Sequence, residues 1–164
     1  MKRPNIGFTL IELVIVIVVI ATLAVTAIPR LINLQVDARI AALNGLKGGM
    51  QSASDMIYPL AIQQGLAEMS SATITIDNEK IKLVYGYPEA NSSEAWSHLI
   101  SGTFENSQWN PERPADWYFT NNSADNFIRF MTKSRKKADD NCLLLYTEAT
   151  ETTLPTFELI TTGC

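Results

Sequence analysis

Histidine and cysteine, which build many catalytic and metal sites, are scarce in this sequence. Its 164 residues include one histidine, His98, and two cysteines, Cys142 and Cys164. No cysteine and no patterned carboxylates lie near His98 in the sequence. A histidine-based triad or metal site would therefore lack its other members. We interpret His98 as part of a short helix, and we expect no catalytic residue, no metal ion, no cofactor and no enzyme activity.

Two other chemical motifs are incomplete. The glycine-rich stretch GLKGGMQS, residues 45–52, lacks the Gly-Lys-Ser/Thr ending of a phosphate-binding loop, and no strand is expected before it. Asp139-Asp140-Asn141 lacks the Asp-x-Asp-x-Asp-Gly spacing of a calcium loop. We interpret the glycines as a source of local flexibility in a helix and the aspartates as a solvated turn.

Basic residues are too few to suggest nucleic-acid binding. The chain has 13 Lys and Arg against 17 Asp and Glu, a formal charge of −4. Nucleic acid favours clustered Lys and Arg, so we expect none as a partner. The basic turn at Lys133–Lys137 is interpreted as solvated, with a patch for polyanions as the alternative. Trp96, Trp109 and Trp117 are interpreted as core residues, with a sugar site as the alternative.

Charge is absent altogether from one long stretch near the N-terminus. Between Leu13 and Ile28 only Thr22 and Thr26 carry polar side chains. This run suits the hydrophobic region of a signal peptide cut after Ala27, or a transmembrane anchor of the usual length of about 20 residues. A third interpretation places a cut between Gly7 and Phe8 and keeps the run in the mature protein.

Glu12 distinguishes these interpretations. A carboxylate near the middle of a bilayer costs about 2.5–3.5 kcal/mol, and a signal peptide gains nothing from it. Near the start of a helix it interacts favourably with the helix dipole. If Phe8 became the N-terminus, its amine would lie one helical turn from Glu12 and could pair with it. The alternative is that Glu12 reaches to the lipid headgroups.

These N-terminal features together resemble a type IV prepilin. A short basic leader precedes GFTLIE, residues 7–12, and a long apolar helix with Pro29 follows. The resemblance implies that a prepilin peptidase cuts after Gly7 and methylates the amine of Phe8. It also implies that Glu12 pairs with the N-terminal amine of a neighbouring subunit, and that Pro29 kinks the helix.

After Pro29 the pattern becomes that of an amphipathic helix. Apolar residues recur at spacings of three, four or seven, which places them on one stripe that rests on a globular domain. They are Val36, Ile40, Leu43, Met50, Ala53, Ile57 and Leu60. We expect one kinked helix from Phe8 to about Gln64, unless Pro59 kinks it again or ends it earlier.

The remaining sequence predicts mainly β-structure. Alternating runs at Ala72–Ile76 and Lys80–Tyr85 indicate a hairpin, and Ser92-Ser93-Glu94 begins a short capped helix that ends before Gly102. Phe104–Pro114 is predicted to be a loop. The other predicted strands are Trp117–Thr120, Asn126–Thr132, Cys142–Thr147 and Thr156–Thr161.

The two cysteines favour a single disulfide. Their even number and an export-like N-terminus point to an oxidising compartment, with two unpaired thiols as the alternative. Such a bond would stabilise the domain by about 3 kcal/mol. The segment from Cys142 to Cys164 resembles the disulfide-bounded loop of type IV pilins, and is most similar to that of the mannose-sensitive haemagglutinin (MSHA) group.

The resemblance implies an α+β pilin fold, in which a long N-terminal helix packs on a mainly antiparallel β-sheet with a C-terminal disulfide-bounded loop. The expected segments are a leader at residues 1–7, a transmembrane and filament-core helix at 8–28, the amphipathic half of that helix at 29–66 and a β-rich head at 67–164.

The function implied is that of a structural subunit of an MSHA-like pilus that supports surface attachment. Expected partners are copies of itself, other pilins, the prepilin peptidase and methyltransferase, the inner-membrane assembly machinery, the membrane and surface glycans. The protein would lie in the inner membrane and then in the extracellular pilus. The alternatives are a type II secretion pseudopilin and a membrane-anchored adhesin that does not polymerise.

Overall fold

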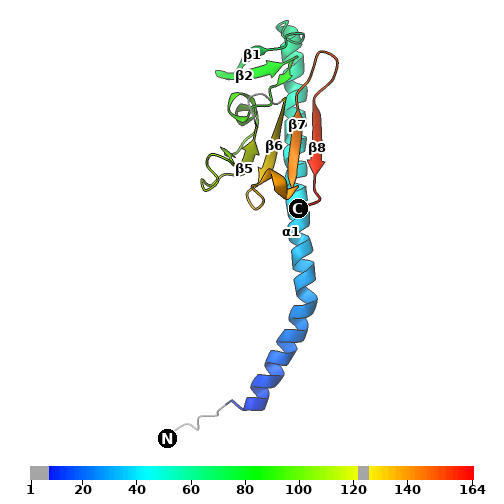
Figure 1. The fold of residues 1–164 in the computed structure, drawn as a ribbon, viewed down its shortest axis with the longest axis vertical. Coiled ribbons are helices and arrows are strands. Elements are labelled where there is room, and N and C mark those ends of the chain that lie inside the picture. The colour runs from blue at the N-terminus through cyan, green and yellow to red at the C-terminus, as the bar shows by residue number, and fades with distance from the viewer. Residues whose placement is uncertain (1–7, 122–125) are drawn as a thin grey trace. The chain divides into compact units, whose positions relative to one another are not determined.

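The computed structural model describes residues 8–121 and 126–164 and contains one long helix, two sheets and several short helical turns (Figure 1). Helix α1 runs from Leu10 to Gln63. The chain forms two compact units, and the boundary between them falls inside α1, after Ala38. The second unit, Arg39–Cys164, is called the head below.

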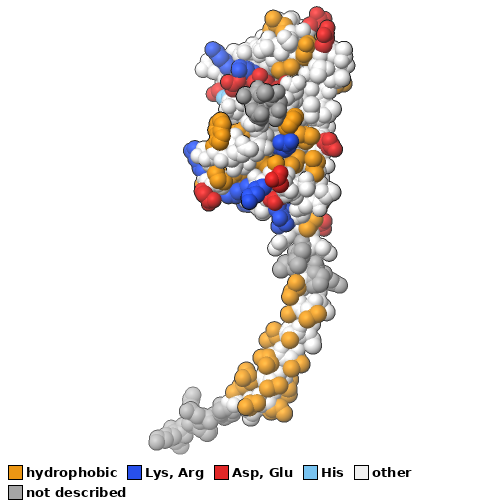
Figure 2. All heavy atoms as spheres, viewed as in Figure 1, with side chains coloured by type: hydrophobic (Ala, Val, Ile, Leu, Met, Phe, Trp, Pro, Cys, Tyr) orange, Lys and Arg blue, Asp and Glu red, His pale blue; other side chains and the backbone are white. Residues whose placement is uncertain are grey.

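In the first unit, helix α1 exposes its apolar side chains. The large hydrophobic residues between Phe8 and Ile28 are exposed, and Figure 2 shows them covering this part of the helix. The most apolar 18-residue window of α1 has a mean hydropathy of 2.9, and none of it is buried. By length and composition, the helix is therefore able to cross a membrane. The helix includes Pro29 in its range. The predicted kink there falls among residues 29–32, whose side chains are outside the described part.

In the head, α1 buries one stripe of side chains. The buried members are Leu43, Leu46, Met50, Ser54, Ile57 and Ala61. The predicted stripe was wrong at its C-terminal end, because Leu60 is 37% exposed and Ala61 takes its place. At 100° per residue, Ala61 lies directly above Leu43 on the helix, whereas Leu60 is displaced by about 100°.

Helix α1 continues past Pro59 and ends with a glycine cap. Gly65 has a φ of +70°, which glycine adopts easily. The Leu66 amide donates to the Ala61 carbonyl at 2.8 Å, and the Gly65 amide donates to the Ile62 carbonyl at 3.0 Å. This pair of bonds is a Schellman motif, which satisfies the last carbonyls of the helix.

A three-stranded antiparallel sheet follows the helix. Its strands are β1 (Ala72–Ile76), β2 (Glu79–Val84) and β3 (Tyr87–Pro88), in that order. The predicted hairpin is confirmed, with Ile76 paired to Glu79. Asp77 and Asn78 both have positive φ, 49° and 69°, as a two-residue type I′ turn requires.

The second sheet has five strands in sequence order. They are β4 (Phe104–Asn106), β5 (Trp117–Thr120), β6 (Phe127–Thr132), β7 (Leu143–Thr147) and β8 (Thr156–Ile160). All neighbours are antiparallel except β4 and β5. The α+β prediction with a mainly antiparallel sheet is therefore confirmed.

The predicted loop at Phe104–Pro114 was wrong in its first three residues. Phe104–Asn106 forms the edge strand β4, which pairs in parallel with Trp117–Phe119. A strand this short has no alternating pattern to reveal it, so only pairing with β5 defines it.

Short helical turns connect the strands. A π-helical turn at Ser92–Trp96 leads into α2 (Ser97–Leu99), and a 3₁₀ turn at Ala138–Asp140 precedes β7. The predicted capped helix is confirmed in place, although its cap is Asn91, whose side chain accepts from the Ser93 and Glu94 amides.

Aromatic residues link the two sheets. Trp96 is fully buried and meets the Tyr146 ring edge-on, with ring centres 4.7 Å apart. The Tyr146 hydroxyl donates to the Pro88 carbonyl at 2.5 Å, which joins β7 of the larger sheet to β3 of the smaller one. Trp96 and Tyr146, together with the Phe157 ring that both contact, therefore join the short helical turn to the two sheets.

Candidate functional site

The most distinctive polar arrangement in the first unit lies at the start of α1. The Glu12 carboxylate accepts from the Thr9 amide at 3.0 Å and from the Thr9 hydroxyl at 2.8 Å. In return, the Glu12 amide donates to the Thr9 hydroxyl at 3.3 Å. This is a capping box, which satisfies free amides at the helix start. The Thr-x-x-Glu spacing could have revealed it, but the sequence interpretation considered only Glu12.

Residues around this box include the expected processing position. Gly7 lies outside the described residues, so cleavage between Gly7 and Phe8 stays a prediction. Phe8 is 73% exposed and immediately precedes Thr9. A cut at this junction would put a new amine beside the capping box, where the Glu12 carboxylate already lies.

The C-terminal segment is fixed by a disulfide and by an arginine from α1. Cys142 and Cys164 are bonded, and both are buried. The Arg39 guanidinium donates to the main-chain oxygen of Cys164 and to the Ser134 hydroxyl, the latter at 3.0 Å. These contacts hold the C-terminus and the β6–β7 turn against the start of the helix in the head. Sequence reasoning missed Arg39, because the spacing of α1 does not show what lies opposite it.

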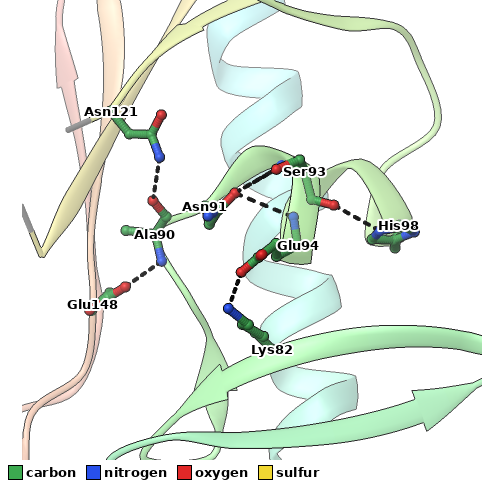
Figure 3. Close-up of polar contacts among 8 residues, drawn as sticks. All are labelled: Lys82, Ala90, Asn91, Ser93, Glu94, His98, Asn121 and Glu148. Atoms are coloured by element: carbon green, nitrogen blue, oxygen red, sulfur yellow. Dashed lines mark hydrogen bonds and ion pairs between the residues drawn. The ribbon is translucent and has the colours of Figure 1, made fainter. Parts of the chain in front are cut away.

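A polar cluster next to α2 has a structural role (Figure 3). The His98 ring contacts the Ser93 carbonyl through Nε2 at 2.9 Å and Glu79 through Nδ1 at 3.1 Å. Both ring nitrogens are thus engaged, and His98 lies in the short helix as predicted. Within residues 8–121 and 126–164, no group of three side chains suited to a metal ion was found.

Glu148, which directly follows β7, forms a hydrogen bond with Ala90 in the segment that leads into this cluster. Its carboxylate accepts from the Ala90 amide at 2.5 Å, and the Asn121 side chain donates to the Ala90 carbonyl at 3.5 Å (Figure 3). Burial raises the pKa of Glu148, although the Ala90 amide opposes this in part. Burial also raises the pKa of Glu89, and the charge of Lys82 opposes it. The Glu148 carboxyl therefore holds two segments of the head together, whereas the buried Glu89 Oε2 has no hydrogen-bond partner among the described residues.

The three tryptophans have different environments. Trp96 is fully buried, as predicted for a core residue, and Trp117 is half-buried. The core prediction was wrong for Trp109, which is 80% exposed on the loop between β4 and β5. The Asn106 side chain accepts from the Gln108 and Trp109 amides and so fixes the turn that carries Trp109.

Two adjoining hollows of about 550 and 570 Å³ lie on the head and share Tyr87 and Leu154. The Tyr58 and Tyr87 rings stack between α1 and β3, with centres 4.6 Å apart. Gly86, with a φ of +81°, lets the chain pass the Tyr58 ring, because a Cβ there would come within 3.0 Å of it. The sequence pattern gave no sign of these hollows.

The N-terminal segment matches a known protein family model. Residues 2–28 match the family model described as the prokaryotic N-terminal methylation motif. The N-terminus is prepilin-like. No curated protein and no solved structure matches the chain. The prepilin-like N-terminus implies processing by a prepilin peptidase and assembly into pilus-like polymers, and with the fold it indicates a structural protein.

Proposed function

We propose that the protein is the structural subunit of a type IV pilus of the MSHA-like kind, and that the pilus supports attachment of the cell to surfaces. The observation that carries this proposal is the coincidence of the methylation motif with an exposed apolar helix. The motif covers residues 2–28, and the large hydrophobic side chains from Phe8 to Ile28 have no cover within the described chain. Such a surface needs either lipid or copies of itself.

In this proposal the apolar segment has two successive environments. Residues 1–7 are removed as a leader, the amine of Phe8 is methylated, and residues 8–28 anchor the subunit in the inner membrane. Assembly then moves these residues from lipid into a filament core. Burial of apolar side chains against other copies replaces their contact with lipid tails, so close packing and polar pairing drive the association.

Glu12 provides the polar pairing. A carboxylate in an apolar core is unfavourable unless it is paired or hydrogen-bonded. The methylated amine of Phe8, from the same or a neighbouring subunit, supplies a positive partner at the end of the helix where the dipole also favours Glu12. Pro29 would bend the helix between its filament-core and head portions.

The head would be displayed outside the filament core and carry the attachment function. The disulfide-bonded segment between Cys142 and Cys164 supports a pilin over a type II secretion pseudopilin, because the major pseudopilins often lack such a bond. Surface glycans, other pilins and the inner-membrane assembly machinery are the proposed partners.

The first test replaces Glu12 with valine. We expect Glu12→Val to leave the membrane-bound amount of protein unchanged but to abolish filaments, because the Phe8 amine would lose its counter-charge. Filaments are counted by electron microscopy, and N-methyl-Phe8 is sought by mass spectrometry of the mature N-terminus. A mature protein that begins at Ile28 would contradict the proposal.

The capping box requires a matched control. Thr9→Val removes the hydroxyl that bonds to Glu12 and keeps the carboxylate. If Glu12 acts by pairing with the amine, Thr9→Val should still form filaments, with a helix-start penalty of about 1 kcal/mol. Equal loss of filaments in both variants would show that Glu12 acts only as a cap.

A further inference from the structure

One hollow surface of the head is acidic and aromatic. The first hollow is lined by Tyr58, Glu68, Tyr85, Tyr87 and Glu151, together with the threonines of the β7–β8 loop. Asp55 lines the adjoining hollow. All three carboxylates are exposed, and no lysine or arginine is among the described lining residues. We name this surface the acidic groove.

The β7–β8 side of the groove is held in shape by its own hydrogen bonds. The Thr150 amide donates to the Thr153 carbonyl at 2.9 Å, and the Thr150 hydroxyl accepts from the Thr153 amide at 3.0 Å. Opposite it, the stacked Tyr58 and Tyr87 rings form a rigid wall. Carboxylates beside tyrosine rings favour lysine ammonium and arginine guanidinium groups, through ion pairing and cation–π contact.

A basic surface lies elsewhere on the same head. The basic turn, Lys133–Lys137, connects β6 to β7 and carries four basic residues, followed by Asp139 and Asp140. Lys136 is engaged, because its ammonium donates to the Pro111 carbonyl at 2.8 Å and lies 4.6 Å from the centre of the Tyr118 ring. Lys133 and Lys137 are exposed, and neither forms an ion pair within the described part of the chain.

The topology of the sheet separates the two surfaces. Strand β7 is antiparallel to both β6 and β8, so the β6–β7 and β7–β8 connections lie at its opposite ends. Figure 1 shows these connections at the two ends of the larger sheet, and Figure 2 shows Lys and Arg side chains gathered at the β6–β7 end. The basic turn therefore cannot reach the acidic groove of its own chain.

We propose that the basic turn of one subunit docks into the acidic groove of another copy of this chain. The inference rests on the proposed pilus function. Two different, complementary patches at opposite ends of a subunit make a head-to-tail contact, which produces open polymers when it does not close into a ring. Charge complementarity would set the register of neighbouring heads, while the apolar helices supply the filament core.

The test is a charge exchange in whole filaments. One variant reverses the groove (Glu68→Lys with Glu151→Lys), a second reverses the turn (Lys133→Glu with Lys137→Glu), and a third combines all four changes. A control variant, Lys80→Glu with Glu158→Lys, changes exposed charges on β2 and β8 outside both surfaces. The fraction of subunits released from purified filaments is measured in low and high salt.

We expect each reversal to raise the released fraction by roughly fivefold in low salt, the effect of about 1 kcal/mol, with a smaller difference in high salt. The combined variant should return to within about twofold of the unaltered protein, and the control should not change. Carbodiimide treatment of unaltered filaments should join Lys133 or Lys137 to Glu68 or Glu151 of another copy.

Failure of the combined variant to recover would overturn the proposed pairing. A result in which the groove reversal weakens the filaments and the turn reversal does not would also overturn it, because the groove would then receive a different cation. If the unaltered protein forms filaments with N-methyl-Phe8 in these experiments, the proposed function stands and only the docking inference fails. If it forms none, both fail.

Discussion

At the scale of single residues, two carboxyl groups in the head hold segments together by accepting hydrogen bonds from residues distant in sequence. Glu148 reaches the Ala90 amide from the end of β7, and Asp116 accepts from the amide and hydroxyl of Thr103 at 2.9 Å. The two differ in burial. The Thr103 hydrogen bonds lower the pKa of the exposed Asp116, whereas burial raises the pKa of the half-buried Glu148. Their contributions to stability therefore have opposite pH dependence.

The Glu148→Gln variant should change the pH dependence of the free energy of unfolding. Because burial raises the pKa of Glu148 in the folded state, the folded state holds its proton to higher pH than the unfolded chain. Stability then falls as pH rises through that window. Glutamine can keep the bond to Ala90 without this loss, so the variant should gain stability relative to the unaltered protein between pH 4 and pH 7.

Urea unfolding of the full-length protein in detergent, followed across that pH range, measures this difference. Glu158→Gln, which removes an exposed carboxyl from β8, is the control for the loss of one negative charge. A difference that stays constant with pH, or one that favours the unaltered protein at pH 7, would contradict the expectation.

At the scale of elements, helix α1 changes its role along its length. Its first unit presents apolar side chains on all sides, whereas within the head it buries a single stripe. The contribution of α1 to the hydrophobic stabilisation of the head therefore depends on the few of its residues that point inward. Position on the stripe, rather than hydrophobicity alone, decides how much each leucine contributes.

Leu46→Ala and Leu60→Ala are a matched pair of variants that test whether position on the buried stripe decides the contribution of a leucine to stability. Leu46 is 5% exposed, so its truncation should destabilise the head by about 2–4 kcal/mol through lost burial and a cavity. Leu60 is 37% exposed and should lose less than about 1 kcal/mol. Denaturant midpoints of the two variants give the comparison. Similar losses at both positions would mean that Leu60 packs as the sequence pattern predicts.

At the scale of the whole molecule, the two units differ in whether their apolar side chains are covered within the described chain. The hydrophobic residues from Phe8 to Ile28 are exposed, whereas Arg39–Cys164 contains the buried stripe, both sheets and the disulfide. If the subunit polymerises as proposed, folding of the head and polymerisation should therefore be separable.

A chain that begins at Arg39 should fold as a soluble monomer and form no filaments. It keeps every residue of the buried stripe and loses the exposed apolar segment through which we propose the subunits associate. Size exclusion and circular dichroism report the monomer and its fold, and a thiol assay should find no free cysteine. Aggregation, or reactive Cys142 and Cys164, would show that the first unit is needed for the head to form.

The sequence alone could predict features that depend on local pattern or on single residue types. The apolar run, the hairpin around Asp77-Asn78 and most strands follow from spacing and turn chemistry. The Cys142–Cys164 pair followed from the cysteine count and its export-like context. The Gly-Phe junction with Glu12 suggested a prepilin, and the match at residues 2–28 supports that interpretation.

Only the tertiary structure decided features that join distant segments. Strand β4 is defined by its pairing with β5, and Arg39 forms a hydrogen bond with Cys164, which is 125 residues away in the sequence. The exposure of Trp109 depends on which parts of the loop pack against the rest of the head. The acidic groove combines α1, β3 and the β7–β8 loop. Periodicity predicts which face of a helix or strand is apolar, but it does not predict which other element packs against that face.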